Sequence, residues 1–287
     1  MAYDHIFRAG NRADILKHVA LLAAADTLAA RHPRDRFVYA DAFAGYACSP
    51  MVGSFGWEDG LGSLLKSQGE QSDDDGARVN PHLALFLRRY FAHTTITSDR
   101  STWRDRPSLV SGIYPGSSLV AFDAIRRHGP TPDLRLFDIS LAVIANLRAV
   151  FREHHATVVG SPAEPESPLL TDVDLLLIDP PGVRSPNDRS APGWNELSAL
   201  ILSGAKSATP LLVWLPIMGD PNGETADSQS WRREIAARDP GVRTWTTQWK
   251  EAAPAHGGML GTQLMWRLPQ DAEAAVFAAL ESIRTQG

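Results

Sequence analysis

The tripeptide Asp179-Pro180-Pro181 directly follows the apolar run 173–178 and carries the clearest chemistry in the sequence. A short apolar run predicts a buried strand, so the carboxylate of Asp179 would lie at the strand's end. Proline has no N–H and fixes its own backbone angle, so the carbonyl groups around Pro180 meet fewer donors within the chain. A carboxylate beside such a carbonyl can accept the hydrogens of a planar amino group. The tripeptide therefore indicates a site that binds an amine.

Asp41 marks a second candidate site, because it ends the predicted strand 37–41 and a turn of small residues, 42–45, follows it. A strand, an acid and a small-residue turn are how an α/β nucleotide site begins. We expect Asp41 either to position this turn or to contact a bound cofactor. Asp138 ends another predicted strand, where an acid suits ribose hydroxyls, but it would equally serve as the cap of the next helix.

Composition narrows the class of protein. The 287 residues are 44% hydrophobic and 21% charged, as in ordinary soluble proteins, and the net charge of −5 argues against a protein that coats nucleic acid non-specifically. No apolar run approaches the roughly 20 residues that span a bilayer, and the N-terminus does not resemble a signal peptide. The single cysteine, Cys48, excludes an internal disulfide, and the histidines lack metal-ligand spacing. We expect a cytoplasmic monomer with no membrane segment and no metal.

Alternating helices and strands must position these residues. Helices are predicted at 12–31, 117–127, 140–154, 194–206, 228–238 and 271–284, and strands at 37–41, 133–138, 156–160, 173–179, 210–216, 242–249 and 261–266. Strands separated by helices indicate an α/β fold with a mainly parallel sheet covered on both faces, and the last two strands would form an antiparallel edge pair. Residues 50–113 break this alternation with glycine-rich turns, the acidic run 71–76 and one helix near 81–91. We therefore expect a main domain of residues 1–49 and 114–287, with 50–113 as an inserted, partly helical subdomain.

Several motifs follow one another in a specific order. The N-terminal block reads Tyr3-x-His5-x-Phe7-x-Ala9-Gly10-Asn11-x-Ala13-Asp14-Ile15-Leu16-Lys17-His18. It is followed by Asp41-Ala-Phe-Ala-Gly45, Tyr114-Pro-Gly-Ser117, Leu136-Phe-Asp138, Ile178-Asp-Pro-Pro181, Val213-Trp-Leu-Pro-Ile217 and Gly257-Gly-Met259. Over nearly the whole chain, these blocks resemble the RlmJ family of adenine-N6 methyltransferases that act on large-subunit ribosomal RNA.

The resemblance implies a Rossmann-like domain that binds S-adenosylmethionine and methylates the exocyclic amine of an adenine in large-subunit ribosomal RNA. It implies that Asp179 and Pro180 are catalytic. The cofactor contacts would be His18, Asp41, Phe43, Gly45, Ser117, Asp138 and Ser161, and the substrate contacts would be Tyr3, Asn11, Lys17, Pro181 and Gly182. Asn11 would equally serve as the cap of the first helix.

Some positions depart from the family's pattern. Gly182 stands where an aromatic residue usually follows Asp-Pro-Pro, Phe43 replaces a histidine, Ala47 replaces a glycine, and the segment 160–162 aligns poorly with the family's Asp-Gly. The lost ring is a stacking surface worth about 1–3 kcal/mol per base. Either another ring, from Trp194, Tyr46 or Trp57, takes its place, or the chain is a catalytically impaired relative that binds RNA. A methyltransferase with a different substrate is the third interpretation.

Overall fold

The computed structural model describes residues 9–50, 57–65, 80–91, 96–98, 107–109, 113–181, 192–220, 223–224, 226–248 and 259–286. Two of the predicted substrate contacts, Tyr3 and Gly182, lie outside these residues, as does the acidic run 71–76. The surroundings of Gly182, which stands where the family usually has an aromatic residue, are therefore not described.

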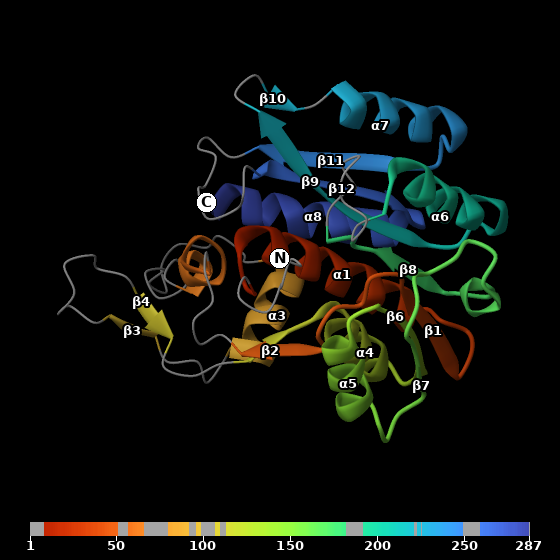
Figure 1. Ribbon diagram of the computed structural model, residues 1–287. Helices are drawn as coiled ribbons and strands as arrows, with labels where there is room; N and C mark the ends of the chain where they lie inside the picture. The colour runs from red at the N-terminus through yellow and green to blue at the C-terminus, as the bar shows by residue number, and fades with distance from the viewer. Residues whose placement is uncertain are drawn as a thin grey trace.

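A mainly parallel β-sheet forms the centre of the molecule, with the strand order β11-β12-β9-β8-β1-β6-β7 (Figure 1). Its strands are β1 (Arg36–Asp41), β6 (Thr131–Phe137), β7 (Ala156–Val159), β8 (Leu175–Ile178), β9 (Leu211–Asp220), β11 (Arg243–Gln248) and β12 (Met259–Arg267), and β10 (Gly223–Glu224) pairs with β9. β12 runs antiparallel between β9 and β11, whereas β7, β6, β1, β8 and β9 are parallel to one another. This arrangement confirms the predicted α/β fold, with a mainly parallel, Rossmann-like sheet.

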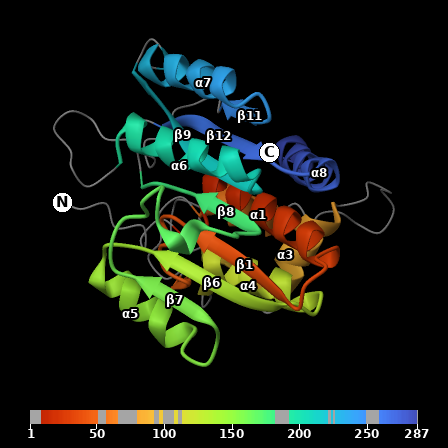
Figure 2. The ribbon, with the colours of Figure 1, turned by 90° about the vertical axis from the view of Figure 1, so that its right-hand side faces the viewer.

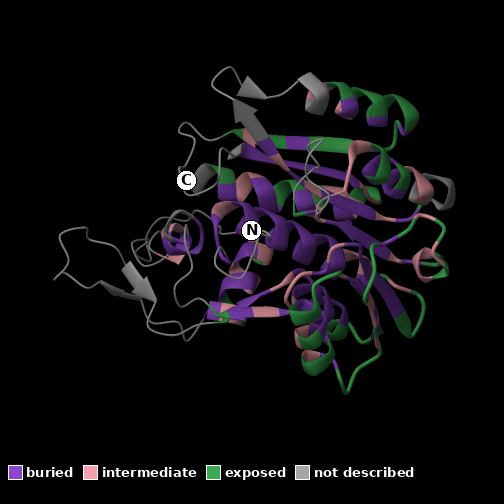
Figure 3. Ribbon diagram, in the orientation of Figure 1, coloured by how far each residue is buried: buried purple, intermediate pink, exposed green. Residues whose placement is uncertain are grey.

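Helices cover both faces of the sheet (Figure 2). One face is covered by α1 (Arg12–Ala30), α4 (Ser117–Arg127), α5 (Leu141–Val150) and α8 (Gln270–Gln286), and the other by α6 (Trp194–Ser207) and α7 (Ala226–Arg238). The central strands β1 and β8 are buried on both faces, which explains why they read as continuous apolar runs (Figure 3). The predicted helices and strands therefore agree closely with those observed.

Two elements of the segment 50–113 pack against the main core. The segment contains a π-helical turn (Glu58–Gly62), α3 (Pro81–Phe91), and the short strands β3 (Ile96–Ser98) and β4 (Pro107–Leu109), while β2 (Cys48–Pro50) pairs with β5 (Ile113–Pro115) where this segment leaves and rejoins the main domain. Leu83, Phe86 and Leu87 of α3 belong to the same hydrophobic cluster as α1 and α8. The π-helical turn and α3 therefore share their core with the sheet, and the division into two domains stays a prediction.

α1 is buried almost all round, which the sequence did not predict. Fifteen of its 19 residues are buried, because α3, α4 and α8 surround the side that the sheet leaves open. Asn11 caps its N-terminus, with the side chain accepting a bond of 3.0 Å from the backbone N–H of Asp14. The capping interpretation of Asn11 is thus the one that the geometry supports, and the cap fixes the start of the helix that carries Lys17 and His18.

At the other end of α1, Asp26 joins the helix to α4 and α3. Its carboxylate bonds with Arg127 and with His128, 2.7 Å away, beyond the end of α4, and lies 3.4 Å from Nε2 of His82 on α3. Burial alone would raise the pKa of Asp26, but the bonds to His82 and His128 and the charge of Arg127 outweigh it and lower the pKa to about 2. The ionised carboxylate therefore stabilises the fold.

We expect Asp26→Asn to lower the free energy of unfolding by about 2 kcal/mol at pH 7, because one pKa unit corresponds to about 1.4 kcal/mol. A depressed pKa stabilises the folded state above about pH 4, and this contribution is lost as the pH falls towards 2, so the deficit of the variant should shrink in that range. Urea unfolding at pH 7, 4 and 3 measures it. The control Glu234→Gln removes the partner of the exposed Arg238 and should cost about 1 kcal/mol or less. Equal losses in the two variants would contradict the assignment.

Candidate active site

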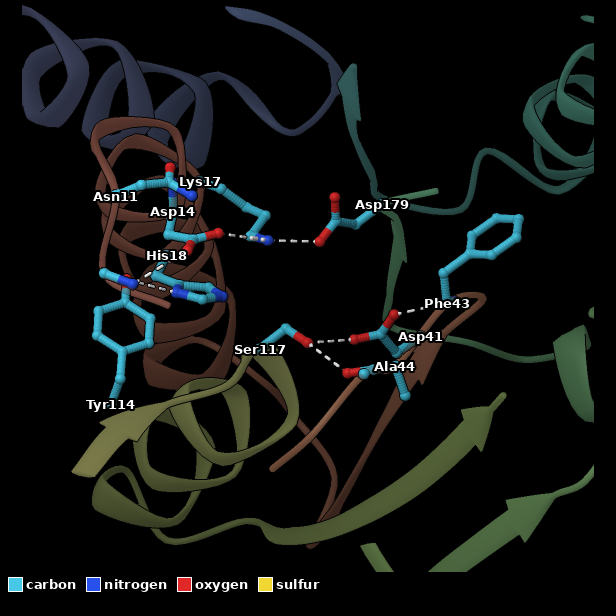
Figure 4. A network of polar contacts seen from close by, with 12 residues as sticks. Asn11, Asp14, Lys17, His18, Asp41, Phe43, Ala44, Tyr114, Ser117 and Asp179 are labelled. Carbon is cyan, nitrogen blue, oxygen red and sulfur yellow. Dashed lines mark hydrogen bonds and ion pairs between the residues drawn. The ribbon is translucent and has the colours of Figure 1, made fainter. Parts of the chain in front are cut away.

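The carboxyl ends of three parallel strands bring Asp41, Asp138 and Asp179 to one edge of the sheet. β1 and β8 are adjacent, but the strands added next extend the sheet in opposite directions from them, through β6 and β7 on one side and through β9 on the other. Ligands of open α/β sheets bind at such a point. The topology therefore places the candidate site between Asp41 and Asp179 (Figure 4).

Lys17 reaches from α1 to Asp179. Its Nζ lies 2.6 Å from Oδ2 of Asp179 and 3.3 Å from Oδ1 of Asp14, and the residue is only 5% exposed. Burial alone would lower the pKa of Lys17, but the charges of Asp179 and Asp14 and the bonds to them raise it above its usual range, so the ammonium is charged. No described residue bonds with Oδ1 of Asp179, which leaves this oxygen for a ligand.

Asp41 lies fully buried beneath the turn that follows β1. Its Oδ2 accepts bonds from the hydroxyls of Ser117, at 2.6 Å, and Tyr39, at 2.9 Å, and its Oδ1 accepts a bond of 3.2 Å from the backbone N–H of Phe43. The Ser117 Oγ also lies 3.3 Å from the carbonyl of Ala44. Of the two roles expected for Asp41, the geometry supports the positioning of this turn.

Asp138 connects the same turn to the start of α5. Its Oδ2 accepts a bond of 3.1 Å from the N–H of Gly45, and its Oδ1 accepts one of 2.7 Å from the N–H of Ser140. The N-cap of α5 is Ser140, whose side chain makes no capping bond, and Asp138 bonds with the N–H of this residue. Gly45 has a φ of +60°, and a Cβ built on it would meet no described atom within 4 Å. The backbone at Gly45 is therefore open to a ligand.

The Tyr114-Pro-Gly-Ser117 segment packs directly against this turn. A side chain on Gly116 would collide with the carbonyl of Tyr46, which explains the glycine in the motif. The hydroxyl of Tyr114 bonds with Nδ1 of His18 at 2.9 Å, and burial raises the pKa of that hydroxyl well above its usual value, so it stays protonated. The structure thus brings His18, Lys17, Ser117, Asp41 and Asp179 together from four separate parts of the chain (Figure 4).

The side chains of some other predicted residues do not take part in this network. The ring of Phe43 points away from the carboxylates (Figure 4). Ser161 is exposed beyond the end of β7, with its hydroxyl 3.5 Å from the carbonyl of Pro162. Pro180 is buried and Pro181 is exposed, directly after Asp179. All four residues therefore lie at or near the carboxyl edge of the sheet. Their positions do not identify which part of a ligand each would contact.

The three aromatic residues expected to replace the missing ring lie in different places. Trp57 is 5% exposed, Tyr46 packs against the main core, and Trp194 packs against Trp231 with ring centroids 4.8 Å apart. The aromatic residue near Lys17 is Trp214 on β9, whose ring centroid lies 5.5 Å from the ammonium. Sequence reasoning missed Trp214 and also Asp14. The spacing of Asp14 and Lys17, three residues apart on one helix, was the available signal for Asp14.

We expect Asp41→Asn to change the pH dependence of stability. Burial is the main cause that raises the pKa of Asp41, to about 6, and the charge of Asp179 adds to it. A raised pKa favours the folded state below about pH 4, and this advantage, about 3 kcal/mol, is lost as the pH rises through 6. The variant cannot ionise, so its free energy of unfolding should fall less than that of the wild type between pH 4 and 7. Urea unfolding at both pH values measures this, and an equal fall in the two proteins would contradict it.

Within the described part of the chain, no helix is long and apolar enough to cross a membrane. The same residues contain no group of three or more His, Cys, Asp or Glu side chains that could hold a metal ion.

Comparison with known proteins yields likenesses of structure alone. No protein-family model and no curated protein matches the sequence. Solved structures that match include a ribosomal RNA methylase from Streptococcus thermophilus (TM-score 0.39, 8% identity, 86% of this chain and 95% of that chain). Others are a candidate class I S-adenosylmethionine-dependent methyltransferase from Listeria monocytogenes (0.43, 10%, 93% and 70%) and precorrin-6y C5,15-methyltransferase from Geobacter metallireducens (0.33, 12%, 54% and 76%). At these TM-scores the likenesses carry no argument about activity, which depends on the site itself.

Proposed function

We propose that this protein is an S-adenosylmethionine-dependent methyltransferase that methylates the N6 amine of an adenine in large-subunit ribosomal RNA. The observation that carries the proposal is the position of Asp179, which ends β8 at the switch point of the sheet, precedes Pro180 and keeps one carboxylate oxygen for a ligand. The ordered motifs that resemble ribosomal RNA adenine-N6 methyltransferases support the substrate. A cytoplasmic location and a monomeric state remain predictions.

The residues near Gly45 fit the cofactor. The open space at Gly45 lets a ligand approach the backbone, and Asp138 places an acid beside it at the end of β6. Asp41, which bonds with the N–H of Phe43 in the same turn, adds negative charge at an edge where a cationic cofactor would bind. We propose that His18, Gly45, Ser117 and Asp138 hold S-adenosylmethionine, which supplies a methyl group on a positively charged sulfur.

Asp179 and Pro180 would act on the amine. An exocyclic adenine amine is a poor nucleophile because its electron pair is delocalised into the ring. When Oδ1 of Asp179 and the carbonyl of Pro180 accept its two hydrogens, electron density returns to the nitrogen and the amine is held in a fixed direction. In the transfer, the nitrogen's electron pair would form the new N–C bond while the methyl–sulfur bond breaks and leaves its electron pair on sulfur, and one N–H proton would pass to Asp179. Lys17 occupies Oδ2 and so fixes which oxygen faces the amine.

A second candidate function is RNA binding without methyl transfer. The observation that favours it is the altered cofactor turn, where the Phe43 ring points away from the carboxylates and Ala47, in place of a glycine, donates its N–H to Asn146 at 2.9 Å. The two candidates differ in one measurable property, which is affinity for the cofactor.

Calorimetry with S-adenosylmethionine tests the enzyme proposal, and no binding at millimolar cofactor would reject it in favour of the RNA-binding candidate. Substrate is tested separately by mass spectrometry of ribosomal RNA from a deletion strain. We expect one N6-methyladenosine of the large subunit to disappear and to return when the gene is restored. An unchanged level together with measurable cofactor binding would indicate a methyltransferase with a different substrate.

A further inference from the structure

Trp214 lies beside Asp179 in the sheet. β8 and β9 pair in parallel with Ile178 opposite Val213, so Asp179 and Trp214 are the next residues on the two strands. Leu177 and Leu212, the preceding residues that point the same way, both pack in the cluster that contains α1. Asp179 and Trp214 therefore face α1, from which Lys17 extends.

The ammonium of Lys17 has a neighbour on three sides. Two are the carboxylates of Asp179 and Asp14, at 2.6 and 3.3 Å, and the third is the ring of Trp214, 5.5 Å from Nζ to the ring centroid. An ammonium group has three N–H donors, and an aromatic face attracts a cation within about 6 Å. The ring thus occupies the side on which water would otherwise solvate the ammonium.

We propose that Trp214 is a positioning residue that holds the Lys17 ammonium on Oδ2 of Asp179, so that Oδ1 alone faces the acceptor amine. Without the ring, water can enter beside Nζ, and the ammonium can move between the two oxygens of Asp179. It would then compete with the amine for Oδ1. The consequence for catalysis rests on the proposed function, whereas the contact between ring and ammonium does not.

Substitution of Trp214 can remove its aromatic face without removing a hydrogen bond to any described residue. Its Nε1 is buried and makes no hydrogen bond with any described residue, so Trp214→Phe removes no bond and keeps an aromatic face. Trp214→Leu removes the face. Trp194→Leu is the matched control, because Trp194 packs against Trp231 among the residues of the opposite cluster.

Nuclear magnetic resonance tests the contact without any need for activity. The chain has only four lysines, Lys17, Lys66, Lys206 and Lys250, so protein labelled with ¹³C at lysine Cε gives few signals. The signal that Lys17→Arg removes belongs to Lys17, and the ring should shift its protons upfield. We expect this shift to persist in Trp214→Phe and in Trp194→Leu and to be lost in Trp214→Leu. A Lys17 signal that does not move in Trp214→Leu would overturn the proposal.

Kinetics test the consequence. We expect Trp214→Leu to lower kcat about tenfold with an unchanged Kd for S-adenosylmethionine, and Trp214→Phe to stay within about threefold of the wild type. In a Lys17→Met background, Trp214→Leu should have no further effect, since neighbours that act together are not additive. A full effect in that background would overturn the proposal. If the wild type shows no turnover, the proposed function fails, and the lysine signals still decide the role of Trp214.

Discussion

Replacement of Asp179 by alanine is expected to abolish methyl transfer, with kcat lowered by about 10²- to 10⁴-fold, the usual contribution of a positioned acid or base. The variant loses the oxygen that would accept the amine hydrogen and the proton. Lys17 keeps its bond to Asp14, 3.3 Å away, so the helix that carries it retains a partner for its charge. Cofactor affinity should stay within about threefold of the wild type, because the residues around Gly45 are untouched.

The matched control is Asp138→Asn, which changes an acid at the same edge of the sheet but on the side of the cofactor turn. We expect it to weaken S-adenosylmethionine binding in calorimetry. Single-turnover rates with saturating cofactor separate the two effects. Turnover retained by Asp179→Ala would remove Asp179 from the mechanism, and unchanged cofactor affinity in Asp138→Asn would remove Asp138 from the cofactor site.

Replacement of Lys17 by methionine is expected to lower the free energy of unfolding by about 3–5 kcal/mol at pH 7, because it leaves two carboxylates without their cation. Asp14 is buried and Asp179 is largely so, and water cannot fully replace the ammonium. The raised pKa of Lys17 keeps the wild-type contribution present at all pH values below the usual lysine range, and it is lost only when the pH rises above that range.

The pH dependence of this loss separates charge from packing. The deficit of Lys17→Met should shrink as the pH falls below about 4, where carboxylates take up protons. Urea unfolding between pH 8 and 3 measures it. The double variant Lys17→Met/Asp179→Asn removes one of the unpaired charges and should recover part of the stability. A deficit that is independent of pH, with no recovery in the double variant, would show that Lys17 contributes only by packing.

More of the fold than of the site could be predicted from the sequence. The strands predicted at 37–41 and 173–179 and the helices predicted at 117–127 and 194–206 have bounds that differ little from those of β1, β8, α4 and α6. β9 is longer than the predicted strand 210–216 because its pairing with β12 and β10 continues beyond the carboxyl edge of its parallel neighbours. Such an extension depends on partners that lie far away in the sequence.

The sequence indicated individual site residues, but it did not indicate which residues contact one another. The bond between Lys17 and Asp179 joins residues 162 positions apart, and the contact between Lys17 and Trp214 depends on the register of β8 and β9. The burial of α1 was missed because an alanine-rich helix looks the same in sequence whether one face or all faces are covered. Sequence patterns report local preference, whereas these contacts arise from tertiary packing.

The packing of α1 against α8 determines when the site can form during protein synthesis. α1 carries Lys17 and His18 and precedes the sheet, while α8 follows every strand, and the two helices pack along each other (Figure 1). A nascent chain that still lacks α8 leaves one side of α1 exposed to water, and Lys17 has no strand to meet until β8 has paired with β1. Domains fold as units while the chain lengthens from its N-terminus. The ammonium and the carboxylate of Asp179 therefore cannot meet before β8 has been synthesised, and α1 keeps one side uncovered until α8 follows.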